Sequence, residues 1–212
     1  MVELNQFAVR VLDTKSNLAY ITKVRGDCHY VEVPHEATYS IELKSNRPNR
    51  SDATISVDGS SIGTFRLEPY GRFNIERPGG VNKSFIFTHE DKTETDKDLI
   101  GKKDNGLITV DFIAEKPRPV TLTTVRSRSF GECKMQCFSD TSSASSGFTM
   151  LGDQTKQSFR SADALNETDE SSKTRITMRL IGGPQRSALQ KQKGLDASNV
   201  MSIPPRVDAI RV

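Results

Sequence analysis

Alternation of polar and apolar residues is the feature that most constrains the fold of this chain. It is clearest in residues 51–78, SDATISVDGSSIGTFRLEPYGRFNIERP, which contain short runs of strand type at 53–57, 62–67 and 70–76. Successive side chains of a strand point to opposite faces of the sheet. A strand in which apolar and polar residues alternate therefore has one face buried and the other exposed to solvent. Asp58-Gly59 predicts a tight hairpin between the first two runs, because glycine accepts a positive φ without a Cβ clash.

The same alternation recurs elsewhere and indicates an all-β fold. In the last regular run Ile176, Met178 and Leu180 share one face, so we expect the packed body to extend to about residue 182. The predicted architecture is an antiparallel β-sandwich of jelly-roll type, and the alternation leaves its strand order open. The other expected strands are residues 5–12, 18–24, 29–33, 37–43, 84–88 and 106–115, with 120–128 as a possible addition.

Polar segments interrupt and end this body. Residues 89–105 are charged and poor in apolar side chains, and residues 139–147 are rich in serine, so we expect mobile loops there. The serine-rich segment fits a domain boundary or a loop inside one domain, and we favour the loop. We therefore expect one body over residues 1–182 and an extended C-terminal tail over residues 183–212.

The net charge of +3 resides in that tail, because basic and acidic residues balance in the rest of the chain. A nucleic-acid-binding body more often has a basic face, so we expect no specific nucleic-acid partner. The tail is weakly basic through Arg186, Lys191, Lys193, Arg206 and Arg211, which outnumber Asp196 and Asp208.

The N-terminal sequence MVELNQFAVRVLD has no positively charged segment followed by an apolar one, so we expect no signal peptide. No apolar run approaches the ~20 residues that span a bilayer, so we expect no membrane span. The cysteines are Cys28, Cys133 and Cys137, and we expect reduced thiols. With no signal peptide expected, the cytoplasm is the expected location unless the chain is part of a larger particle.

The motifs of the common enzyme and cofactor classes do not occur. The sequence contains no GxGxxG, GxxxxGK[ST], HExxH or GxSxG pattern, and no histidine has a second ligand at zinc spacing. We therefore expect no catalytic residue, no cofactor and no metal, and we expect that the protein is not an enzyme. An enzyme of unrecognised type stays open as an alternative, in which His29, His35 or His89 would share a pocket with a carboxylate.

Two segments are candidate partner contacts. The loop 44–50 carries Arg47 and Arg50, which suit an acidic partner, although a solvated connection fits the same residues. The apolar hexapeptide 207–212, VDAIRV, has strand character, so Val207, Ile210 and Val212 are candidate contacts of a strand donated to a neighbouring subunit. A disordered terminus explains this hexapeptide equally well.

Residues 31–78 and 145–181 share a pattern with a known group of proteins. The pattern runs from an alternating strand and a polar loop to Asp-Ala-x-(Ile/Val)-Ser-(Ile/Val)-Asp-Gly, then Gly-Thr-(Phe/Trp)-Arg and a final Glu-Arg-Pro. The matching residues are Asp52, Ala53, Ile55, Ser56, Val57, Asp58, Gly59, Gly63, Thr64, Phe65, Arg66, Glu76, Arg77 and Pro78. On this pattern the chain resembles uncharacterised β-rich proteins of large DNA viruses and some protists. The resemblance implies a compact β-sandwich and a virion or assembly role, and it brings no catalytic residues.

The expected function is therefore that of a non-enzymatic structural protein in a larger assembly. A minor or vertex capsid component of a large DNA virus is the favoured form, joined through loops and the tail to other structural proteins or to further copies of itself. The alternative is a ligand- or glycan-binding β-sandwich, with its site at loops 44–50 and 89–105. The absence of Trp and the presence of only four Tyr count against a glycan site.

Overall fold

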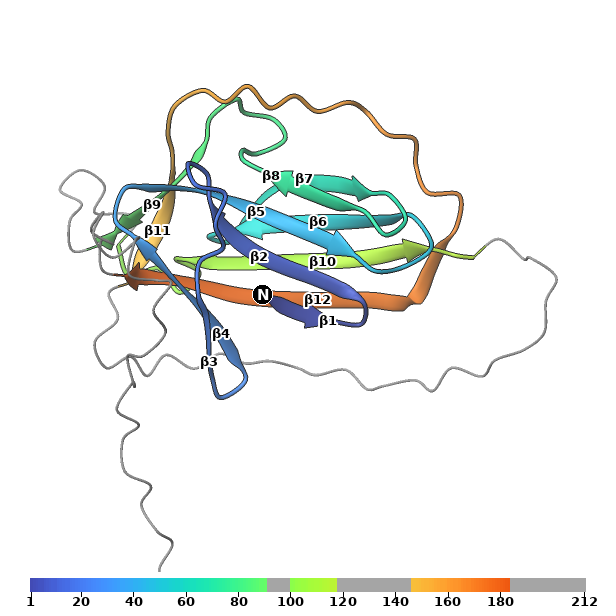
Figure 1. The fold of residues 1–212 in the computed structure, drawn as a ribbon, viewed down its shortest axis with the longest axis horizontal. Helices are drawn as coiled ribbons and strands as arrows, with labels where there is room; N and C mark the ends of the chain where they lie inside the picture. Colours follow the sequence, from blue (N-terminus) through green and yellow to red (C-terminus); the bar gives the residue numbers. More distant parts are fainter. Residues whose placement is uncertain (91–99, 118–145, 184–212) are drawn as a thin grey trace, which may run out of the picture.

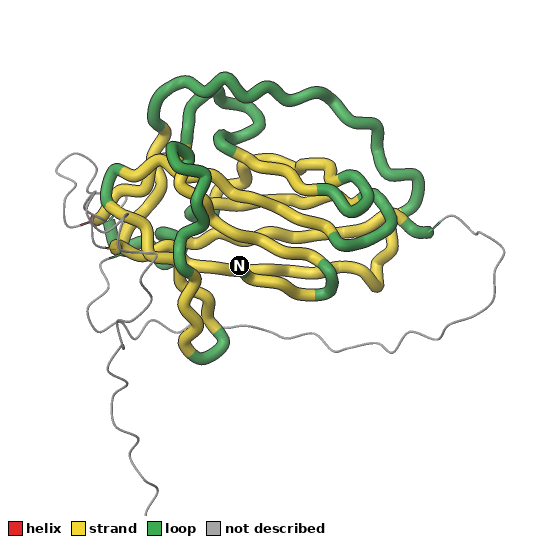
Figure 2. The backbone as a smooth tube through the Cα atoms, in the orientation of Figure 1, coloured by secondary structure: helices red, strands yellow, loops and turns green. Residues whose placement is uncertain are grey.

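The computed structural model describes residues 1–90, 100–117 and 146–183, which form an all-β sandwich (Figure 1, Figure 2). The first sheet contains β1 (Val2–Leu4), β2 (Phe7–Asp13), β5 (Ala37–Ser45), β8 (Arg72–Ile75), β9 (Phe85–His89) and β11 (Gly147–Leu151). The second sheet contains β3 (Thr22–Arg25), β4 (Cys28–Pro34), β6 (Ser51–Val57), β7 (Ser60–Leu67), β10 (Leu107–Glu115) and β12 (Thr168–Gly183).

Each of the two sheets has its own strand order, and consecutive strands of the chain are often not neighbours. The first sheet runs β1-β2-β5-β9-β11, and β8 also pairs with β5. The second runs β3-β4-β12-β10-β6-β7, so β3 and β7 are its edges. All pairs are antiparallel except β4 with β12, where Tyr30 lies opposite Arg179 and Pro34 opposite Gly183 in a parallel arrangement.

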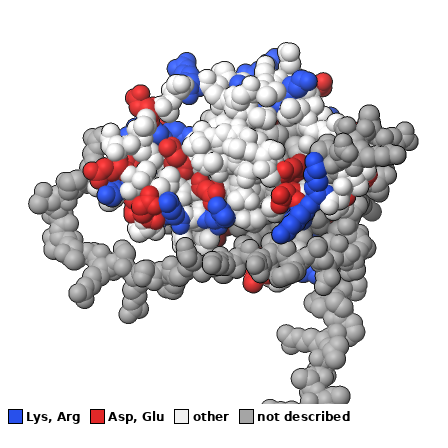
Figure 3. Space-filling view, turned by 180° about the vertical axis from the view of Figure 1, so that it is seen from behind, with Lys and Arg blue, Asp and Glu red and all other residues white. Residues whose placement is uncertain are grey.

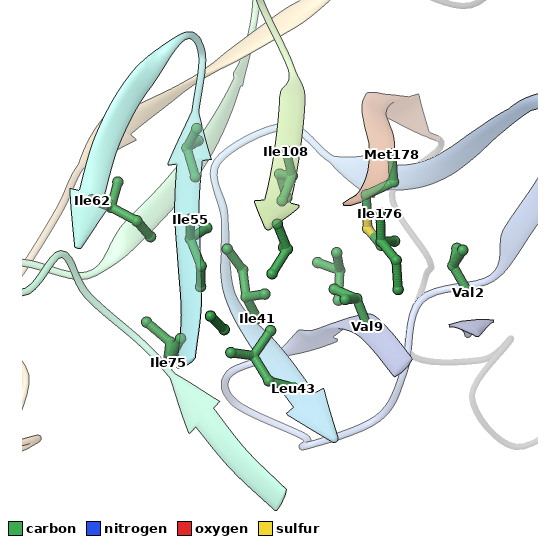
Figure 4. Packing of buried hydrophobic residues seen from close by; sticks show 14 of the residues in the cluster. Val2, Val9, Ile41, Leu43, Ile55, Ile62, Ile75, Ile108, Ile176 and Met178 are labelled. Carbon is green, nitrogen blue, oxygen red and sulfur yellow. The ribbon is translucent and has the colours of Figure 1, made fainter. Parts of the chain in front are cut away.

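The core lies between the two sheets. Figure 4 shows Val9, Ile41 and Leu43 of the first sheet pointing toward Ile55, Ile108 and Ile176 of the second. Phe7 of β2 and Phe112 of β10 stack across the interface with ring centroids 4.4 Å apart. Burying one such side chain contributes about 1.5–3 kcal/mol, so this alternating set is the main source of the sandwich's stability.

The central part of the prediction is confirmed. The runs 53–57 and 62–67 are β6 and β7, and both turn residues between them have positive φ, 51° at Asp58 and 75° at Gly59. The strand expected at 106–115 is β10. The run 174–181 belongs to β12, which begins earlier, at Thr168, because Glu115 and Ala114 of β10 pair with that extension.

The N-terminal prediction needs correction. Asn5 and Gln6, expected inside a strand, both have positive φ and form the turn between β1 and β2. In the segment 18–24 the strand β3 begins only at Thr22, and Ala19 instead makes an isolated bridge with Leu12.

The loop boundaries also differ from the prediction. His89 is the buried last residue of β9, and Asn105 is 4% exposed, so both ends of the expected loop 89–105 belong to the packed body. Gly147 begins β11, and Gly183 still pairs in β12. Residues 139–145, the possible strand 120–128 and the tail beyond Gly183 lie outside the described residues.

Charged side chains on the face turned away in Figure 1 occur in groups of both signs around an uncharged centre (Figure 3). Ion pairs among the described residues include Arg175 with Asp111 and Arg66 with Asp52. Within the described ranges, no helix has the length and apolar character needed to cross a membrane.

Candidate binding groove

A groove of about 550 Å³ lies along the β7 edge of the second sheet. Its lining comes from three parts of the chain: the β6–β7 hairpin, β8 with the turn after it, and residues 158–164. The lining residues are Asp52, Gly63, Thr64, Phe65, Arg66, Phe73, Gly79, Ser158, Phe159, Arg160, Ser161, Ala162 and Ala164. Its volume is in the range of sites that hold small molecules or short peptide segments.

One wall of the groove is a long connection that we call the strap, residues 152–167. It links β11 of the first sheet to β12 of the second, arching over the edge where β7 and β8 lie (Figure 1, Figure 2). Backbone hydrogen bonds hold both of its ends: Ser84 exchanges bonds of 2.8 Å with Gly152 and Asp153, and the N–H of Lys116 donates to Glu167. The strap therefore has fixed ends, and its middle is held mainly through side chains.

Gln157 is the polar anchor of that middle part. The N–H of Glu76 donates to Gln157 Oε1 at 2.9 Å, and Gln157 Nε2 donates to the carbonyl of Asn74 at 2.6 Å. One side-chain amide thus satisfies a donor and an acceptor at the edge of β8, as a neighbouring strand would.

Phe159 is the apolar anchor of the strap and lines the groove. Its ring lies 5.2 Å from that of Phe65 and 6.2 Å from that of Phe73, measured between centroids. Arg77 covers the ring with its guanidinium 4.3 Å from the centroid, and its Nε donates to the carbonyl of Gln157. Aromatic pairs and cation–π contacts of this kind contribute about 0.5–1.5 kcal/mol each, so Phe159 is firmly held.

The charges at the groove are paired on one side and open on the other. Arg66 donates from two nitrogens to the carboxylate of Asp52, at 2.5 and 3.2 Å, and only 12% of its side chain is exposed. Arg160 is exposed, and no carboxylate among the described residues forms an ion pair with it. The groove lining therefore combines aromatic rings, the ion pair of Arg66 with Asp52, and Arg160, a cation with no ion-pair partner among the described residues.

The backbone along this groove is an unpaired strand edge. Among the described strands, β7 pairs only with β6 and is the last strand of its sheet. In the described ranges, residues 63–67 make no backbone hydrogen bond on their outer side; Ile62, just before them, accepts one from Gly79. An edge of this kind can pair with an added extended segment.

The two predicted arginines of loop 44–50 make contacts within the chain. The guanidinium of Arg47 lies 5.2 Å from the centroid of Phe7. Arg50 donates to both oxygens of Glu115, at 2.9 and 2.7 Å, and this hydrogen-bonded carboxylate raises the pKa of Arg50. Their role as partner contacts stays a prediction, and Val207, Ile210 and Val212 lie outside the described residues.

The structure brings two of the three histidines together. The backbone N–H of His89 donates to His35 Nδ1 at 3.1 Å, and the two rings are 5.1 Å apart. His29 lies on β4 opposite Val24, and burial lowers its pKa. The described parts of the chain contain no group of three or more His, Cys, Asp or Glu residues that could hold a metal.

A half-buried carboxylate lies at the tip of the same hairpin that lines the groove. Asp58 accepts hydrogen bonds from the N–H groups of Gly106, at 2.7 Å, and Thr149, at 2.6 Å. Thr149 Oγ1 also lies 2.8 Å from the hydroxyl of Tyr39, a fully buried residue. Burial raises the pKa of Asp58, and the hydrogen bonds only partly oppose this effect. This network ties the two sheets together and gives Asp58 a structural role.

The groove residues were not identified as a site in the sequence. Alternation predicts a strand that contains Phe65 and Arg66 but does not predict a binding site there. No sequence pattern predicts a role for Phe159. The available signal was the isolated apolar residue in the polar stretch 152–162, since an aromatic residue there needs a packing partner. The sequence does not indicate which partner this is.

No protein-family model, curated protein or solved structure matches this chain.

Proposed function

We propose that this chain is a non-enzymatic structural protein that associates with neighbouring proteins through an unpaired sheet edge and its C-terminal tail. The observation that carries the proposal is the edge of β7, which combines unpaired backbone with an aromatic groove. Proteins that avoid association usually cover such an edge or place charges on it. The charged side chain of this part of β7, Arg66, forms an ion pair with Asp52, so it adds little net charge to the edge.

The finer form of the proposal is a minor or vertex capsid component of a large DNA virus, with a jelly-roll arrangement of the strands. Support for it comes from the sequence pattern of residues 31–78 and 145–181 alone. In this form the protein is located in the virion, and its partners are other structural proteins or further copies of itself.

Sedimentation velocity over a concentration series tests the proposal. We expect the full chain to associate, either with itself or with proteins that co-purify stoichiometrically from its native source. A version ending at Gly183 should lose this association, because it lacks the tail. A full chain that stays monomeric and co-purifies with nothing would contradict the proposal.

A second candidate function is the binding of a small ligand or glycan in the same groove. The observation that favours it is the cluster of Phe65, Phe73 and Phe159, which offers an apolar surface beside hydrogen-bonding groups. A glycan array with the full chain tests it, with Arg160→Ala as the groove variant and Arg50→Ala as a variant of the loop first considered. Loss of a signal in Arg160→Ala alone would favour this function.

A further inference from the structure

We infer that the groove beside β7 receives residues 207–212 of a neighbouring copy, which add to the second sheet as one more strand. The inference rests on the proposed function and specifies which surface of one copy the tail of the next contacts. Three features support this contact: the charges on the two edges of the second sheet, the side chains that line the groove, and the length of the tail.

The two edges of the second sheet differ in their charges. On β3, Lys23 forms a largely exposed ion pair with Glu32, and Arg25 is exposed and forms no ion pair with a described residue. Exposed charge of this kind on an edge strand opposes the addition of another strand. At β7 the only charged side chain of the stretch 63–67 is Arg66, which is bound to Asp52. The edge at β7 is therefore better suited to accept a strand.

The groove requires a particular side-chain pattern from an added strand. Side chains that face the aromatic cluster must be apolar, and one that reaches Arg160 should be acidic. In an extended segment 207–212, Asp208, Ile210 and Val212 fall on one face because successive side chains alternate. That face combines two apolar side chains with one carboxylate, which matches the groove.

The geometry permits this contact between copies. Roughly two dozen residues separate Gly183 from Val207, and an extended chain of that length spans on the order of 75 Å. A compact domain of this size has a radius of gyration of about 17 Å, so the tail can reach the groove of an adjacent copy. Main-chain hydrogen bonds to β7 would supply affinity, and the aromatic cluster would supply specificity.

Charge reversal tests the pairing of Arg160 with Asp208. In the full chain, Arg160→Asp or Asp208→Arg alone places like charges together, and we expect each to weaken self-association by about tenfold. The double variant restores opposite charges and should recover most of the loss. Arg25→Asp is the matched control, because it reverses an exposed cation on the β3 edge and should leave association unchanged.

A photo-cross-linking amino acid at position 64 locates the bound segment directly. A mixture of ¹⁴N- and ¹⁵N-labelled full chains is irradiated, and the linked peptides are identified by mass spectrometry. We expect links between position 64 and residues 207–212 that join a light chain to a heavy chain. Links that occur only within one chain, or that join position 64 to another region, would overturn the inference.

The two proposals fail in different ways. If the version ending at Gly183 loses association but neither charge reversal nor cross-linking implicates the groove, the inference is wrong and the proposed function stands. If the full chain does not associate at all, both the proposed function and the inference are overturned.

Discussion

The carboxylate of Asp58 and the backbone N–H of Thr149, 2.6 Å apart, connect the two sheets of this protein at one end of the sandwich. Asp58 ends the β6 strand of the second sheet in a turn with positive φ, and Thr149 belongs to β11 of the first. The same carboxylate also accepts from Gly106 at the start of β10. One side chain in a tight turn therefore fixes three separate parts of the chain.

Asp58→Asn should destabilise the fold by about 1–3 kcal/mol, because an amide nitrogen replaces one of the two oxygens that accept hydrogen bonds from the partly buried N–H groups of Gly106 and Thr149. Asn tolerates positive φ nearly as well as Asp, so the turn itself is preserved. Urea unfolding measures the loss. Asp27→Asn, in the exposed turn between β3 and β4, is the control and should change stability little. Equal losses in both variants would contradict a special role for Asp58.

The raised pKa of Asp58 also predicts a pH dependence. Since burial makes its folded-state pKa higher than its unfolded-state value, the folded state binds the proton more tightly. The stability that Asp58 contributes is complete below the unfolded pKa, about 3.9, and is lost as pH rises through the folded pKa. The difference in unfolding free energy between wild type and Asp58→Asn should therefore shrink from pH 3 to neutral pH. A difference that grows with pH would refute this sign.

Gly106→Ala should cost at least about 3 kcal/mol, because two penalties add. Gly106 has a φ of 71°, and a Cβ there would lie 2.4 Å from the carbonyl oxygen of Leu180. Gly101→Ala is the matched control, with a φ of 75° and nothing within 4 Å of the added Cβ, and it should cost only about 1–2 kcal/mol. Thermal and urea unfolding of both variants give the comparison. Similar losses in the two would show that the close approach to Leu180 is relieved easily.

Gln157→Ala should loosen the strap while leaving the sandwich folded. The amide that bridges Glu76 and Asn74 is lost, so backbone groups at the edge of β8 become accessible to water. Hydrogen–deuterium exchange should become faster in residues 153–163 and at Glu76, with little change in the core strands. Gln154→Ala, an exposed position on the same strap, is the control. Unchanged exchange at Glu76 would mean that the strap does not depend on this anchor.

Local sequence signals predicted the parts of the fold that depend on local chemistry. The hairpin at Asp58-Gly59 follows from two adjacent residues and their conformational preferences, and β10 follows from its own alternation. The turn at Asn5-Gln6 was missed because it has no glycine, although Asn accepts positive φ. Short strands such as β1 give too little alternation to identify.

The groove could not be predicted, because its parts are distant in the sequence. Phe65, Phe73 and Phe159 come from β7, β8 and the strap, and only the packed sandwich brings their rings within about 6 Å of each other. The loop arginines were predicted as surface contacts for the same reason. The partner of Arg50, Glu115, is at the far end of β10, and no local pattern connects the two.

The parallel pairing of β4 with β12 has a consequence for the order of events during synthesis. The partner residues of β4, 179–183, follow it by about 150 residues and leave the ribosome correspondingly later. Until they emerge, the hairpin of β3 and β4 lacks the neighbouring strand β12. The backbone edge of β4 that later pairs with β12 stays unpaired during that time. The nascent chain therefore cannot complete its second sheet before residues 179–183 have been made, and pairings of such long sequence separation form slowly.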